Sequence, residues 1–560
     1  MRILSTLLAA VLLAGCSLPK MIKTVEEINL EVTPSPVVLQ GNDVTIDITG
    51  TFPPKYFAKK VTVEATPYLV WEGGEVAFES VNFQGEDAAG NGTVVSWENG
   101  KSFNYTSTVT YVGDMKDNAS LELRMSGAQG DKTAEFGAIT LAKGVMATQD
   151  LIQPDEAYVI ATDNFQRVIT YAQDLTFNYG YQSSALKSAE YRDEDWKATK
   201  DLFALAASAD SVNVIGVTTA SYASPEGEIS LNEDLAMDRA KSANKAVTRE
   251  LSRKKLNLDD EAVRAEPKGE DWEGFKKAMR ASDIADKDLI LRVLEMYSDK
   301  NKREEEIKNI AKTYKEIENN ILPDLRRSQV SIVYTVEGYT DEELVDLAKN
   351  NADILTVEEL LFAATLFEDS NNKLEVYQNT ARVHANDYRG HNNVGVVLTD
   401  LGRMKQAEES FNAAKALAGG NGVVNTNLGA MARQNGDVEG AAAYYGKASG
   451  VAELSYNKGV LAIAQGDYGR AISSMGGSTT LNLALAKILN GDANGARTAL
   501  QNGDSDSAIA DYLLALCAAR LDDAAGVRKH IRAALDKDTS LRNRALNDLE
   551  FRNHKESLIN

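Results

Sequence analysis

The sequence predicts a multidomain protein with an N-terminal all-β sandwich, a central α/β domain and a C-terminal all-α repeat array. Three observations lead to this prediction. Apolar and polar residues alternate in the first part of the chain, strand and helix patterns mix in the middle, and the last part contains an internal repeat. With 560 residues, the chain is long enough for three or four domains of ordinary size.

Composition argues against several functions. The chain carries 82 acidic and 60 basic side chains, for a net charge of −22, so a phosphate backbone would be repelled and no nucleic-acid partner is expected. Only four histidines and two cysteines are present, none in an H-E-x-x-H or C-x-x-C arrangement, so no metal site and no cofactor are expected. The chain also lacks a G-x-S-x-G motif. We therefore predict a protein without catalytic residues, while a carboxylate pair in a cleft remains the enzymatic alternative.

The first residues predict an export signal. An apolar run over Ile3–Leu13 is too short to cross a bilayer and has the length of a signal-peptide core. It ends in Leu-Ala-Gly-Cys, which resembles a bacterial lipobox. That resemblance implies removal of residues 1–15, a lipid on Cys16 and attachment to the outer membrane, with 16–25 as the anchor linker. The segment after Cys16 has no acidic residue, which favours the periplasmic face over the cell surface. The alternative is an ordinary signal peptide with a chance cysteine.

Residues 26–147 show the pattern of short strands. Segments such as Val44–Ile48 and Phe103–Tyr111 alternate apolar and polar residues, and Gly/Asn clusters separate them. This spacing predicts an antiparallel sandwich of the immunoglobulin-like kind. Trp71 and Trp97 lie on or beside these strands, where they either pack on the core or offer a surface for stacking on a sugar ring.

Residues 155–338 combine strands and helices. A strand over Ser211–Val217 leads into the turn Tyr222–Gly227, and the helical spacing of Leu231–Val247 follows. A further strand is expected at Gln329–Tyr334. These elements predict an α/β domain.

The strand, the Ser-Pro-Glu-Gly turn, Asn232 and Arg239 resemble the C-terminal peptidoglycan-binding domain of OmpA-type proteins. In that family an aspartate and an arginine bind the diaminopimelate group of the cell-wall peptide. The arginine corresponds to Arg239, but Ser224 occupies the aspartate position, and Glu226 is the available substitute. The resemblance therefore gives Ser224, Glu226, Asn232 and Arg239 as candidate peptidoglycan-binding residues. With a β-rich domain that opens on Val32–Pro36, the chain is similar to the OmpA-related lipoproteins of Bacteroidetes.

The α/β region is longer than the family pattern. Between Val263 and Leu322 lies a long charged segment with helical character, and its aliphatic positions predict an added helical subdomain. Residues 339–385 are expected to form a helical connector.

The last part of the chain repeats itself. Starting from Gly395, a Gly, an Ala and a bulky residue follow at offsets of 7, 12 and 16, and the same pattern starts again at Gly429 and Gly459. The first spacing is 34 residues and the later ones are shorter. The positions resemble tetratricopeptide repeats (TPR), which implies an all-α solenoid of paired helices over 386–553.

The TPR resemblance implies a concave groove that binds a partner peptide. The candidate groove residues are Asn392, Asn393, Val396, Thr426, Asn427, Arg433, Tyr456, Asn457, Val460 and Leu485. Asn393, Asn427, Asn457 and Asn482 occupy one equivalent position in successive repeats. Two interpretations stay open: these amides bind a partner's backbone, or they join neighbouring repeats.

These expectations combine into one functional hypothesis. The chain would be a non-catalytic outer-membrane lipoprotein scaffold that recruits envelope proteins through its repeats, with peptidoglycan as a second contact, in a secretion or assembly complex. The alternative is a surface-exposed lipoprotein that binds a glycan or a host protein through its sandwich.

Overall fold

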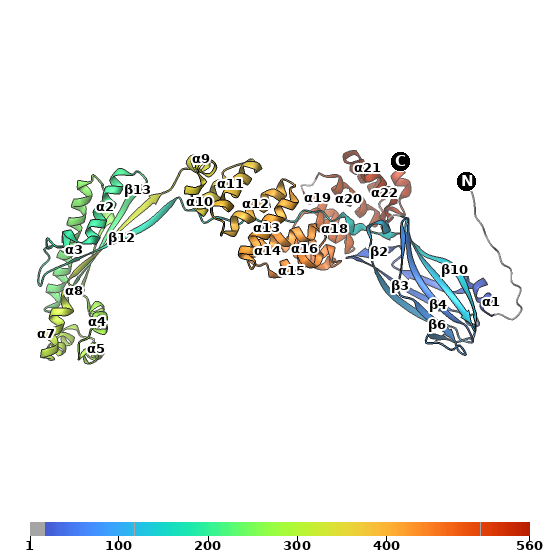
Figure 1. The fold of residues 1–560 in the computed structure, drawn as a ribbon, viewed down its shortest axis with the longest axis horizontal. Coiled ribbons are helices and arrows are strands. Elements are labelled where there is room, and N and C mark those ends of the chain that lie inside the picture. The colour runs from blue at the N-terminus through green and yellow to red at the C-terminus, as the bar shows by residue number, and fades with distance from the viewer. Residues whose placement is uncertain (1–16, 117, 504–505, 560) are drawn as a thin grey trace. The chain divides into compact units, whose positions relative to one another are not determined.

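A computed structural model describes residues 17–116, 118–503 and 506–559, so the predicted signal peptide and Cys16 lie outside the described residues. The chain divides into two compact units (Figure 1). The first combines the chain up to Thr162 with the part from Phe367 onward, and the second is Asp163–Leu366. None of the described helices has both the length and the apolar character that a membrane crossing requires.

The N-terminal region is a sandwich of two sheets. The first has the strand order β1-β3-β2-β11, with β8 paired to β3, and the second has the order β10-β9-β4-β6-β7, with β5 paired to β4. In β3, every second side chain is buried, as the alternation predicted. The strands are β1 (Asn29–Thr33), β2 (Val37–Gln40), β3 (Asp43–Phe52), β4 (Thr62–Trp71), β5 (Gly74–Ala77), β6 (Val81–Gly85), β7 (Thr93–Val95), β8 (Lys101–Thr110), β9 (Ser120–Gln129), β10 (Lys132–Lys143) and β11 (Val145–Met146).

A short helix docks on this sandwich. Helix α1 (Ser17–Lys23) buries Leu18 and Met21 among the core residues of the sandwich. The hydroxyl of Tyr56 donates a hydrogen bond of 3.0 Å to the carbonyl of Met21. Most of the predicted anchor linker, 16–25, is therefore helix packed on the sheets, because its apolar side chains cover core surface.

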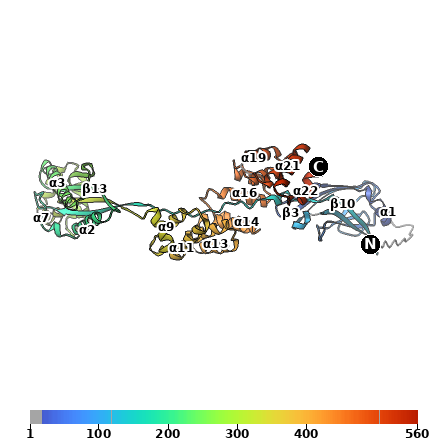
Figure 2. The same ribbon diagram turned by 90° about the horizontal axis from the view of Figure 1, so that it is seen from above.

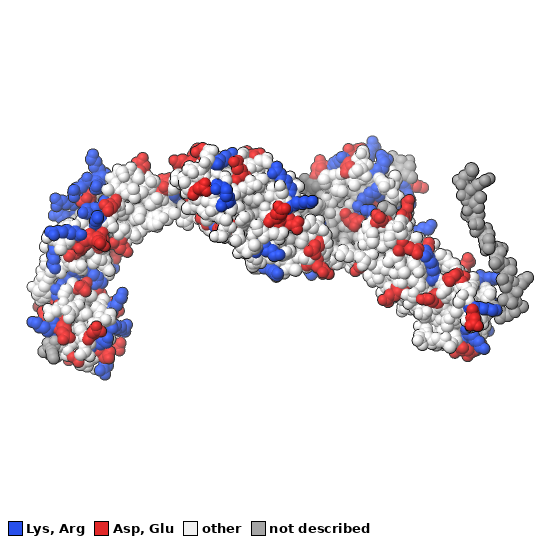
Figure 3. Space-filling view, in the orientation of Figure 1, with Lys and Arg blue, Asp and Glu red and all other residues white. Residues whose placement is uncertain are grey.

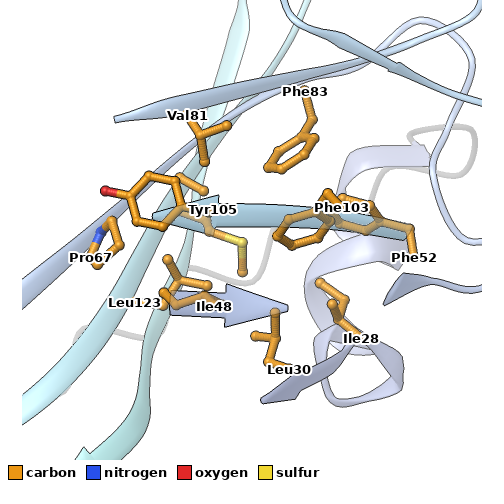
Figure 4. Close-up of a pocket in the computed structure, with 12 residues that line it drawn as sticks. Ile28, Leu30, Ile48, Phe52, Pro67, Val81, Phe83, Phe103, Tyr105 and Leu123 are labelled. Carbon is orange, nitrogen blue, oxygen red and sulfur yellow. The ribbon is translucent and has the colours of Figure 1, made fainter. Parts of the chain in front are cut away.

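The sandwich core holds a small cavity. It measures about 20 Å³ and is lined by side chains from both sheets, including Phe52, Phe83 and Phe103 (Figure 4). This is about the space of one water molecule, and the apolar lining offers water no hydrogen-bond partners. We therefore treat the cavity as a packing feature of the core.

The second unit is built on a four-stranded sheet of order β12-β15-β13-β14. Helices α2 and α3 pack on it around Phe177, Phe203 and Val247. The strands and these two helices are β12 (Val168–Asn178), α2 (Glu194–Ser208), β13 (Val212–Ala223), α3 (Ile229–Arg253), β14 (Val263–Glu270) and β15 (Arg327–Glu337). The unit starts at Asp163, whereas the sequence analysis placed the start of the α/β domain at 155.

The long charged segment forms helices with a core of their own around Phe275, Ile290 and Ile317. These helices are α4 (Trp272–Ala281), α5 (Lys287–Met296), α6 (Lys300–Lys308), α7 (Ala311–Asn320) and α8 (Leu322–Leu325). The predicted connector, 339–385, is divided: α9 (Asp341–Asn350) and α10 (Val357–Thr365) belong to the second unit, while α11 (Ser370–Val383) belongs to the first.

The C-terminal helices pack as consecutive pairs: α12 on α13, α14 on α15, α16 on α17, α18 on α19 and α20 on α21. They are α12 (Tyr388–Asp400), α13 (Met404–Ala418), α14 (Gly422–Gln434), α15 (Val438–Lys447), α16 (Leu454–Ala464), α17 (Tyr468–Met475), α18 (Leu481–Leu489), α19 (Ala493–Asn502), α20 (Ala508–Arg520), α21 (Ala524–Lys537), α22 (Leu541–Asn547) and α23 (Lys555–Ile559). Each repeat glycine marks a close approach: Gly395 meets the ring of Phe411, and Gly429 meets the ring of Tyr445.

The sandwich and the repeats are joined within the first unit. The side chain of Gln149 exchanges two hydrogen bonds of 2.9 Å with the backbone of Gly41, and it accepts another from the hydroxyl of Tyr468 at 2.8 Å. The hydroxyl of Thr148 donates to Glu550 at 2.6 Å. On the face shown in Figure 3, acidic and basic side chains are interspersed over this unit, without the single-sign stripe typical of nucleic-acid interfaces.

Replacing Gly429 by valine should destabilise the repeats. A Cβ atom at Gly429 would lie 2.3 Å from Cε1 of the buried Tyr445 ring, so either the ring or the helix must move. We expect a loss of about 2 kcal/mol in the free energy of unfolding, measured by urea denaturation. Gly446→Ala is the matched control, because a Cβ at this exposed position meets nothing within 4 Å. Equal destabilisation by both changes would contradict the close-contact role of Gly429.

Candidate functional site

One extended segment of the chain runs along the repeats. After the short helix η3 (Thr148–Leu151), residues Ile152–Thr162 have no regular secondary structure. We call this segment the strap. It lies along the helices of the repeat array, as the cyan trace in Figure 2 shows.

The strap backbone is held by a row of asparagine side chains. Each amide oxygen accepts a hydrogen bond from a strap N–H, and the amide nitrogen of the same side chain donates to the carbonyl of the same strap residue. All these bonds measure 2.7–2.9 Å, and the pairs are Asn393 with Ala161, Asn427 with Val159, Asn457 with Ala157 and Asn482 with Gln153. An asparagine amide has one donor side and one acceptor side, so it can replace a neighbouring strand.

The spacing of these contacts fits an extended chain. Ala157, Val159 and Ala161 are bound by three successive repeats, one asparagine for every two strap residues. Two residues of extended chain span roughly 6.6 Å, and alternate residues present their backbone groups to the same side. The next contact falls four residues earlier, at Gln153, beyond the strap's Pro154.

The strap supplies two hydrogen-bond partners to each of these asparagine side chains, while Asn392 supplies a further one to Asn393 and to Asn427. Asn393, Asn427, Asn457 and Asn482 are each at most 1% exposed. A buried amide without a hydrogen-bond partner costs about 1–3 kcal/mol. The strap is therefore part of the folded repeat array.

Side chains of the strap add selective contacts. The carboxylate of Glu156 is buried and forms an ion pair with Arg433. Gln434 donates to Glu156 at 3.1 Å and accepts from the hydroxyl of Tyr158 at 3.1 Å. The ring of Tyr158 also stacks on Phe411, with ring centroids 5.7 Å apart. The groove thus binds a glutamate and an aromatic residue two positions later.

Asp155 provides a further polar contact. Its two carboxylate oxygens accept from the hydroxyl of Tyr456 at 2.7 Å and from Asn482 at 2.6 Å. Partial burial raises the pKa of Asp155, and the charge of Glu156 adds to this, while the hydrogen bonds from Tyr456 and Asn482 act in the opposite direction.

The predicted groove residues therefore meet a segment of their own chain. Hydrogen bonds or ion pairs to the strap come from Asn392, Asn393, Asn427, Arg433, Tyr456 and Asn457. The other four, Val396, Thr426, Val460 and Leu485, are buried among the repeats, and Thr426 donates to the carbonyl of Gly422. The expected free groove for an outside peptide is corrected: in this structure the strap fills it.

Sequence reasoning missed the strap itself and its contacts to Phe411. It placed the start of the α/β domain at 155 and so counted residues 155–162 with that domain. A usable signal was present. Asparagine recurs at an equivalent position of four successive repeats, and Ile152–Thr162 shows no helical periodicity, which together favour an extended segment as partner.

The predicted peptidoglycan-binding residues lie together, but their polar atoms are engaged within the domain. Arg239 is 1% exposed. Its guanidinium donates to the backbone carbonyls of Ser183 at 3.0 Å, Tyr222 at 2.8 Å and Gly180 at 3.4 Å. Burial lowers the pKa of Arg239 to about 10, a value at which it is still charged at neutral pH. Because three carbonyls already surround this charge, it is not presented to a ligand.

The loop residues are engaged as well. Ser224 donates to Glu226 at 2.5 Å, and Arg326 forms an ion pair with Glu226 at 2.7 Å. Asn232 donates to the carbonyl of Glu226 at 3.0 Å and to the carboxylate of Glu270 at 2.9 Å. Thus Glu226, the expected substitute for the missing aspartate, already has an arginine as its partner.

Comparisons with known proteins do not assign this chain to a family. No protein-family model matches the sequence, and no curated protein matches it. Among solved structures, a tetratricopeptide repeat protein from Parabacteroides merdae matches with 14% identity and a TM-score of 0.29, over 39% of this chain and 91% of its own. The Pseudomonas aeruginosa pilF structure matches with 16% identity and a TM-score of 0.29, over 38% of this chain and 99% of its own. The APC/C hetero-tetramer Cut9-Hcn1 matches with 13% identity and a TM-score of 0.31, over 60% of this chain and 77% of its own. TM-scores this low do not carry a conclusion about the present chain.

Replacing Asn427 by aspartate should weaken the hold on the strap. The carboxylate keeps the acceptor for the Val159 N–H but loses the donor to the Val159 carbonyl and to Asn392. We expect a loss of about 3 kcal/mol in the free energy of unfolding, because a buried charge would face carbonyl oxygens. Asn412→Asp, on the exposed side of α13, is the control and should change stability by less than about 0.5 kcal/mol. Unfolding curves that coincide for the two variants would contradict the role given to Asn427.

Proposed function

We propose that the protein is a non-catalytic scaffold of the bacterial cell envelope, anchored by a lipid on Cys16 to the periplasmic face of the outer membrane, which holds envelope proteins in place. The observation that supports a scaffold most is the asparagine row. These asparagine side chains bind peptide backbone, and the backbone that they bind is the chain's own strap. In the proposal this arrangement stabilises the repeats, and no catalytic step is assigned to it.

The strap region connects the sandwich to the repeats. The contacts of Gln149 and Thr148 tie the strap's N-terminal end to the sandwich and the repeats, and the asparagine row continues from there to Ala161. Sandwich and repeats therefore act as one body. Since the groove is filled, partner proteins in this proposal contact other surfaces of the repeats and the second unit.

The position of α1 supports an anchor without a spacer. Ser17 donates from its hydroxyl to Gln129 at 3.1 Å, and Leu18 is 3% exposed in the sandwich core. A lipid on Cys16 would be attached one residue away from this docked helix. In the proposal, the sandwich rests close to the membrane surface and carries the repeats.

Two other functions receive less support. Peptidoglycan binding is not part of the proposal, because Arg239 and Glu226 are engaged within their domain. Glycan or host-protein binding through the sandwich tryptophans is also left out, because Trp71 packs against the sandwich core and is only partly exposed.

Radiolabelled palmitate incorporation and membrane fractionation test the anchor. The unaltered chain should take up label and sediment with outer membranes, and Cys16→Ser should do neither. Cys517→Ala is the control, because Cys517 is buried in the repeats and its loss should leave labelling unchanged. Label or membrane association that survives Cys16→Ser would contradict the proposed anchor.

A further inference from the structure

Strand β12 is the outer strand of the sheet in the second unit. Toward its C-terminal end, the N–H groups that point away from the sheet are capped by carboxylates. Asp195 accepts from the Thr176 N–H at 2.7 Å, and Glu190 accepts from the Asn178 N–H at 2.7 Å. Capping of this kind prevents another strand from pairing with the edge.

The other end of β12 has no such caps. Its pairing with β15 runs from Val168 to Asn178 without a register shift, so even-numbered residues point their backbone groups outward along the whole strand. Among the described residues, the outward N–H groups of Val168, Thr170 and Ala172 have no hydrogen-bond partner. The edge without carboxylate caps therefore extends from Val168 to Asp174, where the exposed Gln173 side chain donates to one side of the Asp174 carbonyl at 3.1 Å.

Side chains on this edge are also open to pairing. Val168, Ile169 and Tyr171 are 51%, 41% and 44% exposed. Residues 168–173 contain no charged residue, no proline and no glycine. Protein edges usually carry such residues, or bulges, to discourage pairing, and residues 168–173 carry none of them.

We propose that the uncapped half of β12 pairs antiparallel with the same segment of a second copy of this chain, so that two four-stranded sheets become one continuous sheet. The proposal rests on the edge geometry and is independent of the membrane anchor. The uncapped segment is complementary to itself when the two-fold axis passes through its middle residue, Tyr171. Every outward residue then faces an outward residue, which is the condition for ladder hydrogen bonds.

The side chains fit this register. Asp174, the one charged residue of the segment, faces Val168 of the second copy, so two carboxylates do not meet. Thr170 faces Ala172, and Tyr171 faces Tyr171. The carboxylates of Asp195 and Glu190 stop the pairing beyond Asp174, which sets the length of the interface.

Engineered cysteines test both the pairing and its register. In the full chain carrying Cys16→Ser, Tyr171→Cys places two thiols opposite each other, at a Cα separation of about 4.5 Å that suits a disulfide. Mild oxidation should therefore give a covalent dimer. Ile169→Cys is the matched control: Ile169 would face Gln173, and the two Ile169 positions would lie about 13 Å apart along the strands, too far for a disulfide.

Sedimentation velocity provides a second, independent readout. Ala172→Pro removes an outward N–H that the sheet does not use, so the fold should persist while dimers disappear. Ala172→Ser keeps the N–H and should keep the dimers, and circular dichroism melting checks that both variants fold. A chain that stays monomeric at all concentrations, or cysteine variants that cross-link equally, would overturn the proposal. Cross-linking of Tyr171→Cys to a different protein in native membranes would also overturn it.

Discussion

The buried asparagine amides of the repeats are the constraint on which the rest of the first unit depends. Each sits in a nearly water-free position, where it must exchange hydrogen bonds with something. The strap supplies the required backbone groups at Gln153, Ala157, Val159 and Ala161. Losing the strap would remove two hydrogen bonds from each amide and open the groove to water, at a net cost of about 0.5–1.5 kcal/mol per bond, so the repeats and the strap stabilise each other.

The strap and the asparagines that bind it are far apart in the sequence. The strap precedes the second unit, whereas the asparagines that bind it follow that unit, so Ala161 and Asn393 must meet across the whole inserted domain. The insertion is compatible with this because its own ends lie close together: the rings of Phe165 and Phe362, near the first and last residues of the unit, stack with their centroids 4.4 Å apart. Contacts of such long sequence separation form slowly, so we expect the repeats to complete their folding after the second unit.

The sequence allowed the local features to be predicted better than the long-range ones. Alternation in β3 and the glycine contacts at Gly395 and Gly429 follow from side-chain size and period, which a sequence displays directly. The strap was missed because the asparagines bind its backbone, so the pattern appears in the repeats and almost none of it in the strap's own side chains. Arg239 was predicted to bind peptidoglycan for a similar reason. Its hydrogen-bond partners are the backbone carbonyls of Ser183 and Tyr222, and a sequence motif does not show backbone contacts.

Hydrogen exchange of the strap, followed by mass spectrometry on the full chain, tests the central claim most directly. The account predicts that the amides of Ala157, Val159 and Ala161 exchange as slowly as helix interiors of the repeats, because each donates to a buried asparagine. It also predicts that Asn427→Asp accelerates exchange in the strap. A strap that exchanges as fast as an exposed loop in the unaltered chain would contradict the account, and the groove would then be open to other partners.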